Sequence, residues 1–147
     1  MENKMKIYIT AETNGVQTVA KAGKHTVIVD EPVNMGGKDE GADPLSTFLS
    51  ALAGCENVIA NLVAKEIHFD LQRIEFDVTG ILDPRGFMGE PNVKPYFEKV
   101  IIHAKVKTSE TQERVNELQK ITDQRCPIFT TLKAAGIELE VNWTKAS

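Results

Sequence analysis

The segment of residues 44–66 constrains the fold more than any other part of the chain. Its apolar residues fall on several faces at helical spacing, so a helix here is apolar around most of its circumference. Asp43 can cap its amino end and Pro44 suits the first turn, which predicts a helix to about Glu66. Residues 48–64 are also too few, and too interrupted by polar side chains, for a bilayer span. We therefore expect a buried helix and no membrane anchor.

Segments on both sides of this helix alternate between apolar and polar residues, as strands do. Before it, residues 5–9, 16–20 and 26–29, separated by glycine turns, predict an antiparallel meander. After it, residues 71–82 and 96–107 predict a hairpin with a long loop, and residues 137–143 predict a last strand. The loop over residues 83–95 is either a binding element or a segment that packs on a partner subunit.

Two more helices are predicted before the last strand. Ser109 and Gln112 form a capping-box pattern at the start of a polar, amphipathic helix over residues 110–124. Pro127 then starts a short helix that Gly136 ends. Strands segregated from helices in this order indicate an α+β fold with antiparallel sheet. A chain of 147 residues with 41% hydrophobic composition suits a single domain over residues 1–147.

Composition argues against several classes of partner. The net charge is −4, with both signs interspersed, which predicts neither a nucleic-acid surface nor a membrane surface. The first residues lack the apolar core of a secretory signal, so we expect a cytoplasmic protein. The three histidines share no ligand spacing with a cysteine and no phosphate loop is present, so no metal or cofactor is predicted.

The two cysteines are the candidate reactive groups, as free, reactive or buried thiols. Cys126 is predicted to cap the helix that starts at Pro127, where the helix dipole, worth roughly 0.3–1 kcal/mol, lowers a thiol pKa by less than one unit. Arg125 could lower it further. A purely structural role for each cysteine is equally compatible with the residues alone, because buried free cysteine usually acts as a small hydrophobe.

Cys55 is expected to be largely buried, because it falls on an apolar stripe of the long helix: Leu45, Phe48, Leu52, Cys55, Ile59 and Leu62. Glu56 lies on another mostly apolar line, and burial there would raise the pKa of its carboxyl group unless a cation pairs with it. A third row is small and polar, and could face another backbone or a partner subunit: Ser50, Gly54, Asn57 and Asn61.

Three stretches together resemble the OsmC/Ohr family: residues 36–45, residues 52–55 ending at Cys55, and residues 125–128 around Cys126. The resemblance spans nearly the whole chain and is closest to the divergent OsmC-like branch. It implies a two-layer fold in which antiparallel sheets wrap around central helices of an intertwined homodimer. It also implies a thiol peroxidase that reduces organic hydroperoxides, with Cys55 peroxidatic and Cys126 resolving, and a dithiol reductant that reopens their disulfide.

The chain departs from the active members of that family at two positions. They use an arginine in the amino-terminal meander, whereas the first arginine here is Arg73, and Leu45 stands where they have a glutamate. Glu56 could supply the carboxylate, and four side chains could supply the cation: Lys21, Lys24, His25 and Lys38.

Two functions are therefore predicted. The first is reduction of small organic hydroperoxides in a pocket lined by Phe48, Leu52 and Phe87, with Cys55, Glu56 and Cys126 as catalytic residues. The alternative is a dimer with little or no catalysis that binds or senses a small apolar or thiol-reactive ligand.

Overall fold

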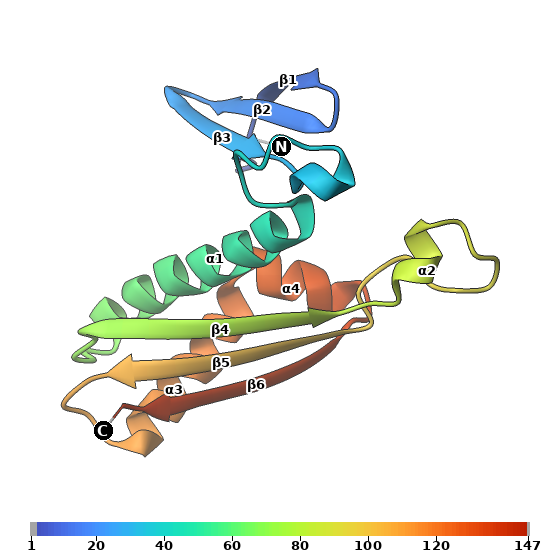
Figure 1. Cartoon of the computed structure of the whole chain (residues 1–147). Helices are drawn as coiled ribbons and strands as arrows, with labels where there is room; N and C mark the ends of the chain where they lie inside the picture. The colour runs from blue at the N-terminus through green and yellow to red at the C-terminus, as the bar shows by residue number, and fades with distance from the viewer. Residues whose placement is uncertain (1–2, 147) are drawn as a thin grey trace. The chain divides into compact units, whose positions relative to one another are not determined.

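The computed structural model describes residues 3–146. The chain divides into two compact units, residues 1–48 and 49–147. Strands β1 (Thr10–Asn14), β2 (Gln17–Ala22) and β3 (His25–Val29) form an antiparallel sheet in that order in the first unit (Figure 1). Gly15 and Gly23 occupy the turns with φ of 60° and 62°, a conformation that favours glycine. The structure confirms an antiparallel meander and the predicted second and third strands.

The predicted strand over residues 5–9 is wrong, because the first strand begins at Thr10. The turn at Gly15 fixes the register and pairs Thr10 with Lys21, and β2 ends one residue later at Ala22. Residues 5–8 therefore lie beyond the end of β2, and the apolar side chains of residues 5–9 are exposed.

Asp30 organises the loop that follows β3. Its carboxylate is completely buried and accepts hydrogen bonds from Nε2 of Gln17 at 2.9 Å and from the backbone N–H of Glu31, Lys38 and Glu40 at 2.8, 3.3 and 3.2 Å. The hydrogen bond from Gln17 is the main reason that the pKa of Asp30 falls to about 2. The loop, with the 3₁₀ turn η1 (Val33–Met35), is thus built around one buried charge that the sequence analysis missed.

The second unit contains a mixed three-stranded sheet. Strands β4 (Arg73–Ile81) and β5 (Lys99–Lys107) pair antiparallel, as predicted, and β6 (Glu138–Lys145) lies on the other side of β5. However, β6 runs parallel to β5, so the expectation of antiparallel pairing throughout is wrong. Helices α3 (Gln112–Arg125) and α4 (Pro127–Ala134) form the crossover connection between the parallel strands β5 and β6.

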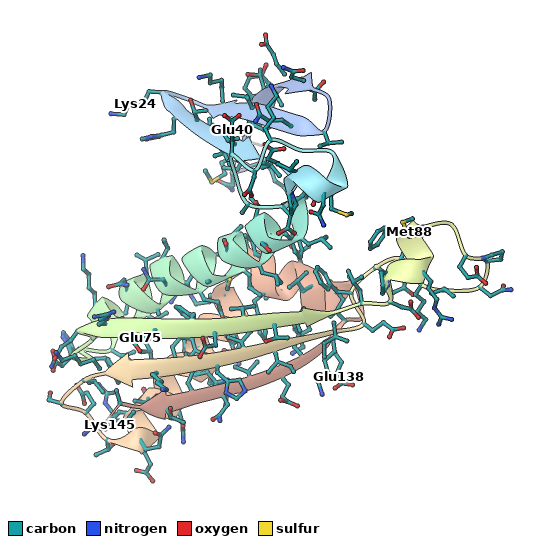
Figure 2. The ribbon with its side chains drawn as sticks, in the orientation of Figure 1. Lys24, Glu40, Glu75, Met88, Glu138 and Lys145 are labelled. Carbon is teal, nitrogen blue, oxygen red and sulfur yellow. The ribbon has the colours of Figure 1, made fainter. Side chains whose placement is uncertain are left out.

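Helices cover one face of this sheet, which gives the second unit two layers (Figure 1). Side chains of β5 alternate: Val100, Ile102, Ala104 and Val106 are buried under the helices. The opposite face is polar, and Figure 2 shows the side chains along the sheet, including Glu75 and Glu138. The core contains residues of α1 and α3 together with the strands: Ala60, Val63, Val115, Leu118 and Trp143.

The long helix α1 (Pro44–Glu66) has the predicted bounds, and Oδ2 of Asp43 accepts a hydrogen bond from the N–H of Ser46 at 3.0 Å. Its buried face is the line that contains Glu56, because its buried residues are Leu52, Glu56, Ala60, Val63 and Ala64. The predicted stripe through Leu45, Phe48 and Leu62 is instead partly exposed, at 42%, 41% and 48%.

The prediction that the apolar stretch of α1 is too short to span a bilayer also needs correction. The helix is long and apolar enough to cross a membrane, and 28% of its most apolar window is buried within the chain. A core helix of a soluble protein passes the same test, so this property alone is weak support for a membrane span.

The predicted capping box of α3 is wrong as well. Thr111 caps the helix by accepting a hydrogen bond from the N–H of Arg114, whereas Ser109 donates one to Asp70. Gln112 links the helix to β6 by donating to the backbone carbonyl of Trp143 and accepting from the N–H of Lys145.

Replacing Asp30 tests the role of the buried carboxylate. Because its pKa in the folded state is depressed, it stabilises the fold at neutral pH, and that stabilisation disappears as the pH falls from about 4 to about 2. We expect D30N to lower the melting temperature at pH 7 by about 4–8 °C. The difference from the unmodified protein should shrink towards pH 2. D39N, in the same loop, is the matched control, and equal effects of the two variants would contradict this role.

Candidate active site

The two cysteines come from different elements of the second unit. Cys55 lies on α1, and Cys126 lies at the junction between α3 and α4. Cys126 belongs to a buried cluster of the second unit, and Cys55 packs against that cluster. The Cys55 thiol is close enough to interact with the Cys126 thiol. Apolar side chains from α1, α4 and β5 surround them: Leu52, Val100, Ile102, Phe129 and Leu132. The fold thus brings together the two sulfur atoms that the sequence analysis singled out.

Cys126 caps α4, as predicted, and its Sγ accepts a hydrogen bond from the N–H of Phe129 at 3.4 Å. The predicted effect on its acidity is wrong. The side chain is completely buried, and burial raises the pKa of the thiol by more than this hydrogen bond lowers it. Arg125 does not assist, because its guanidinium binds the carboxylate of Glu66 at 2.6 and 3.1 Å.

Glu56 is a buried ionisable residue of the site. It is 0% exposed, and within the described residues neither carboxyl oxygen accepts a hydrogen bond from a nitrogen or hydroxyl donor, although the Asp123 carboxyl group and the Cys126 thiol lie within reach. Burial is the main cause that raises its pKa from 4.5 to about 9, and the neighbouring Asp123 carboxyl group adds to the shift. The predicted burial of Glu56 and the raised pKa are confirmed. The carboxyl group is therefore neutral at physiological pH.

Cys55 is half-buried, so the prediction that it is largely buried is wrong. The reason is the rotation of α1, whose buried face centres on Glu56 and leaves Cys55 at its edge. The four candidate activating cations, Lys21, Lys24, His25 and Lys38, belong to the first unit. Activation of Cys55 by one of them stays a prediction.

The predicted substrate-binding residues lie in different surroundings. Leu52 is completely buried in the same cluster as Cys126. Phe87 lies outside this cluster, in the short helix α2 (Pro84–Phe87) beyond the end of β4, and is 54% exposed (Figure 1). Phe48, at the end of the first unit, is 41% exposed. Contact of Phe48 and Phe87 with a substrate stays a prediction.

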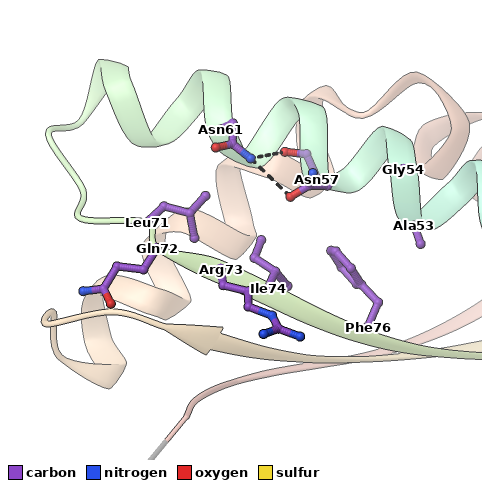
Figure 3. Close-up of a pocket in the computed structure, with 9 residues that line it drawn as sticks. All are labelled: Ala53, Gly54, Asn57, Asn61, Leu71, Gln72, Arg73, Ile74 and Phe76. Atoms are coloured by element: carbon purple, nitrogen blue, oxygen red, sulfur yellow. Dashed lines mark hydrogen bonds between the residues drawn. The ribbon is translucent and has the colours of Figure 1, made fainter.

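A groove of about 470 Å³ lies between α1 and β4 (Figure 3). The small polar row of α1 forms one wall, where Nδ2 of Asn61 donates to the backbone carbonyl of Asn57 at 2.9 Å. Gly54 lines the groove although the adjacent Cys55 does not. The other wall combines polar and apolar side chains: Leu71, Gln72, Arg73, Ile74 and Phe76.

Asp123 is the residue of the site that the sequence analysis missed. It lies on α3, three residues before Cys126, and its carboxyl group is the partner of Glu56. A usable signal was present, because Val115, Leu118, Thr122 and Cys126 mark the buried side of α3 and Asp123 adjoins it. Residues 3–146 contain no group of three or more His, Cys, Asp or Glu side chains that could hold a metal ion.

The family model for OsmC-like proteins matches residues 37–142, a stretch that includes both cysteines. This chain belongs to the OsmC-like protein family. Two curated relatives are named hydroperoxide reductase. The one from Mycoplasma genitalium is 29% identical over 98 residues, and the one from Mycoplasma pneumoniae is 26% identical over 109 residues. The alignments cover 65% and 71% of this chain, and 64% and 72% of those relatives.

Solved structures of OsmC-like proteins have the same fold. The OsmC-like protein of Mycoplasma pneumoniae matches with a TM-score of 0.84 and 24% identity, over 97% of this chain and 99% of that chain. The organic hydroperoxide resistance protein OhrB of Bacillus subtilis matches with a TM-score of 0.65 and 19% identity, over 95% and 98%. These likenesses confirm the predicted α+β OsmC-like fold.

The two thiols should differ in reactivity towards an alkylating agent. Cys126 is completely buried with a raised pKa, whereas Cys55 is half-buried. Iodoacetamide added to the reduced native protein at pH 7.5 should therefore modify Cys55 at least about tenfold faster than Cys126. Peptide mass spectrometry over time measures both rates. Modification of Cys126 first would contradict the geometry.

Replacing Glu56 with glutamine should change how stability depends on pH. The folded state holds the Glu56 proton up to about pH 9, whereas the unfolded state releases it near pH 4.5, so the native protein loses stability as the pH rises between these values. E56Q should unfold like the unmodified protein at pH 5, and be more stable by about 1–3 kcal/mol at pH 9. Denaturant titrations measure this, with E113Q on the exposed surface of α3 as control. A constant difference across the range would refute it.

Proposed function

We propose that the protein is a thiol-dependent reductase of organic hydroperoxides, with Cys55 as the peroxidatic and Cys126 as the resolving cysteine. The observation that carries the proposal is the interaction of the two thiols within one apolar cluster. Family membership and the hydroperoxide reductase names of the two Mycoplasma relatives support it.

The first step of the proposed reaction takes place at the accessible sulfur. The Cys55 thiolate attacks the terminal oxygen of the hydroperoxide, an S–O bond forms, and the O–O bond breaks. The alkoxide leaves with a proton as an alcohol, and Cys55 becomes a sulfenic acid. The half-buried position of Cys55 suits this role, because a substrate has to reach the attacking sulfur.

The second step uses the buried sulfur. Cys126 attacks the sulfur of the Cys55 sulfenic acid, an S–S bond forms, and hydroxide leaves as water after gaining a proton. A dithiol reductant then reopens the disulfide by exchange. The full burial of Cys126 suits a resolving role, because its partner is another atom of the protein.

The apolar surroundings of the thiols favour small organic hydroperoxides over hydrogen peroxide. Leu52 contributes to this environment, and we propose Phe48 and Phe87 as further residues that contact the substrate. We further propose a cytoplasmic homodimer in which each chain acts as one OsmC-like domain. The family model supports the single domain, because it runs across the boundary between the two units.

A dimer that binds or senses a small apolar or thiol-reactive ligand is the alternative. Burial and the neighbouring Glu56 and Cys55 raise the pKa of Cys126, and no positively charged side chain is among the groups that shift it. Without a nearby cation, a thiolate in an apolar cluster is costly. Thermal-shift screening of a C55S/C126S double variant with fatty acids separates the functions, because a ligand that stabilises it acts without redox chemistry.

Peroxide titration tests the leading proposal. Cumene hydroperoxide should remove two thiols per chain and produce one intramolecular disulfide. C55S should lose the reaction, whereas C126S should stop at a Cys55 sulfenic acid that dimedone traps, as seen by mass spectrometry. Unchanged thiol content, or equal thiol loss in C55S, would refute the peroxidase.

A further inference from the structure

The strongest unexplained feature of the second unit is a pair of buried carboxyl groups next to the thiols. Both oxygens of Glu56 and Oδ1 of Asp123 are buried, and among the described residues none of the three accepts a hydrogen bond from a nitrogen or hydroxyl donor. The Asp123 carboxyl group is nevertheless within hydrogen-bonding reach of Glu56. Buried polar atoms without partners are rare in native proteins, so this arrangement needs an explanation.

A proton between the two groups supplies that explanation. Two ionised carboxylates are both acceptors and repel each other, so they cannot face each other in an apolar interior. If one is protonated, its O–H donates to the other, and a single negative charge is spread over the pair. The pair then titrates as one unit rather than as two independent acids.

The two carboxyl groups differ in their access to solvent. Glu56 is completely buried on the inner face of α1. Asp123 lines a groove of about 500 Å³ formed by α3, α4 and β6, in which Lys133 also lies. Oδ2 of Asp123 accepts a hydrogen bond from Nε2 of Gln119 at 2.9 Å, which fixes the carboxyl group at the wall of this groove. Asp123 therefore joins the enclosed Glu56 to an open surface.

The thiols lie at the inner end of the same arrangement, because both Cys126 and Cys55 interact electrostatically with Glu56. On the outer side, the charge of Lys133 favours ionised Asp123. The strand side chains that pack in the cluster around the thiols include Val100, Ile102, Leu139 and Val141.

We propose that Glu56 and Asp123 share one proton, and that Asp123 is the positioning residue through which this pair exchanges protons between Cys126 and the groove of α3 and α4. The role in catalysis rests on the proposed function and extends its second step. The ionised member of the pair takes the proton of the Cys126 thiol, and the thiolate attacks Cys55. When the S–O bond of a sulfenic acid breaks, the same pair returns the proton to the departing hydroxide.

One test of the shared proton does not depend on any reaction. Carboxyl carbon NMR follows the titration of Glu56 in the unmodified protein, in D123N and in the control E113Q on the same helix. Because Asp123 raises the pKa of Glu56, D123N should lower that pKa by at least about one unit, whereas E113Q should leave it unchanged. Coincident Glu56 titrations in D123N and the unmodified protein would overturn the proposal.

A second test follows proton transfer from Cys126 without a hydroperoxide. An aromatic disulfide reagent first forms a mixed disulfide with Cys55, and attack by Cys126 then releases a second equivalent of coloured thiol. At pH 7, D123N should slow this second phase by roughly tenfold or more and shift its pH profile, and D123E should restore both. A D123N profile that coincides with the unmodified one would overturn the role of Asp123.

The two tests separate this proposal from the peroxidase proposal. If the NMR and mixed-disulfide results appear as expected but cumene hydroperoxide leaves the thiols unchanged, the shared proton stands and the peroxidase fails. If the hydroperoxide reacts but D123N changes neither measurement, the peroxidase stands and the carboxyl pair fails.

Discussion

The packing of α1 onto the sheet through the face that contains Glu56 is the interaction on which the candidate site depends. Leu52, Ala60 and Val63 are completely buried on this face, so Glu56 has to be buried with them. The same rotation leaves Cys55 at the edge of the helix, where it is half-buried. Packing of one apolar face thus decides which thiol is accessible and which carboxyl group is enclosed.

Burial disfavours the ionised forms of the Glu56 carboxyl group and the Cys126 thiol group, so these groups are held in their neutral forms. An ionised carboxylate or thiolate without a partner is strongly disfavoured in an apolar interior, and its pKa rises until the neutral form dominates. Glu56 and Cys126 both follow this rule. Asp30 shows the opposite solution, because four hydrogen-bond donors keep its equally buried carboxylate ionised. Thiol chemistry in such an interior requires a route for protons.

Sequence patterns predicted the positions of helices and strands better than they predicted which strands pair and which side chains meet in the folded chain. Asp43 and the apolar run after it were sufficient to place α1, and Cys126 before Pro127 was sufficient to place the cap of α4. The parallel pairing of β6 was missed because alternation is the same in parallel and antiparallel strands. Asp123 was missed because, although it adjoins the apolar side of α3, its partner Glu56 lies on another helix and only tertiary packing brings the two together. The lowered pKa expected for Cys126 failed because burial outweighs a helix dipole worth roughly 0.3–1 kcal/mol.

The central claim is that folding brings the sulfur atoms of Cys55 and Cys126 together. Equilibration of the native protein in glutathione redox buffers, with the products quantified by mass spectrometry, measures their effective concentration towards each other. The account predicts an intramolecular Cys55–Cys126 disulfide as the dominant oxidised product, with little Cys55–glutathione adduct at equilibrium. A stable adduct at Cys55 alongside a free Cys126 thiol would contradict it.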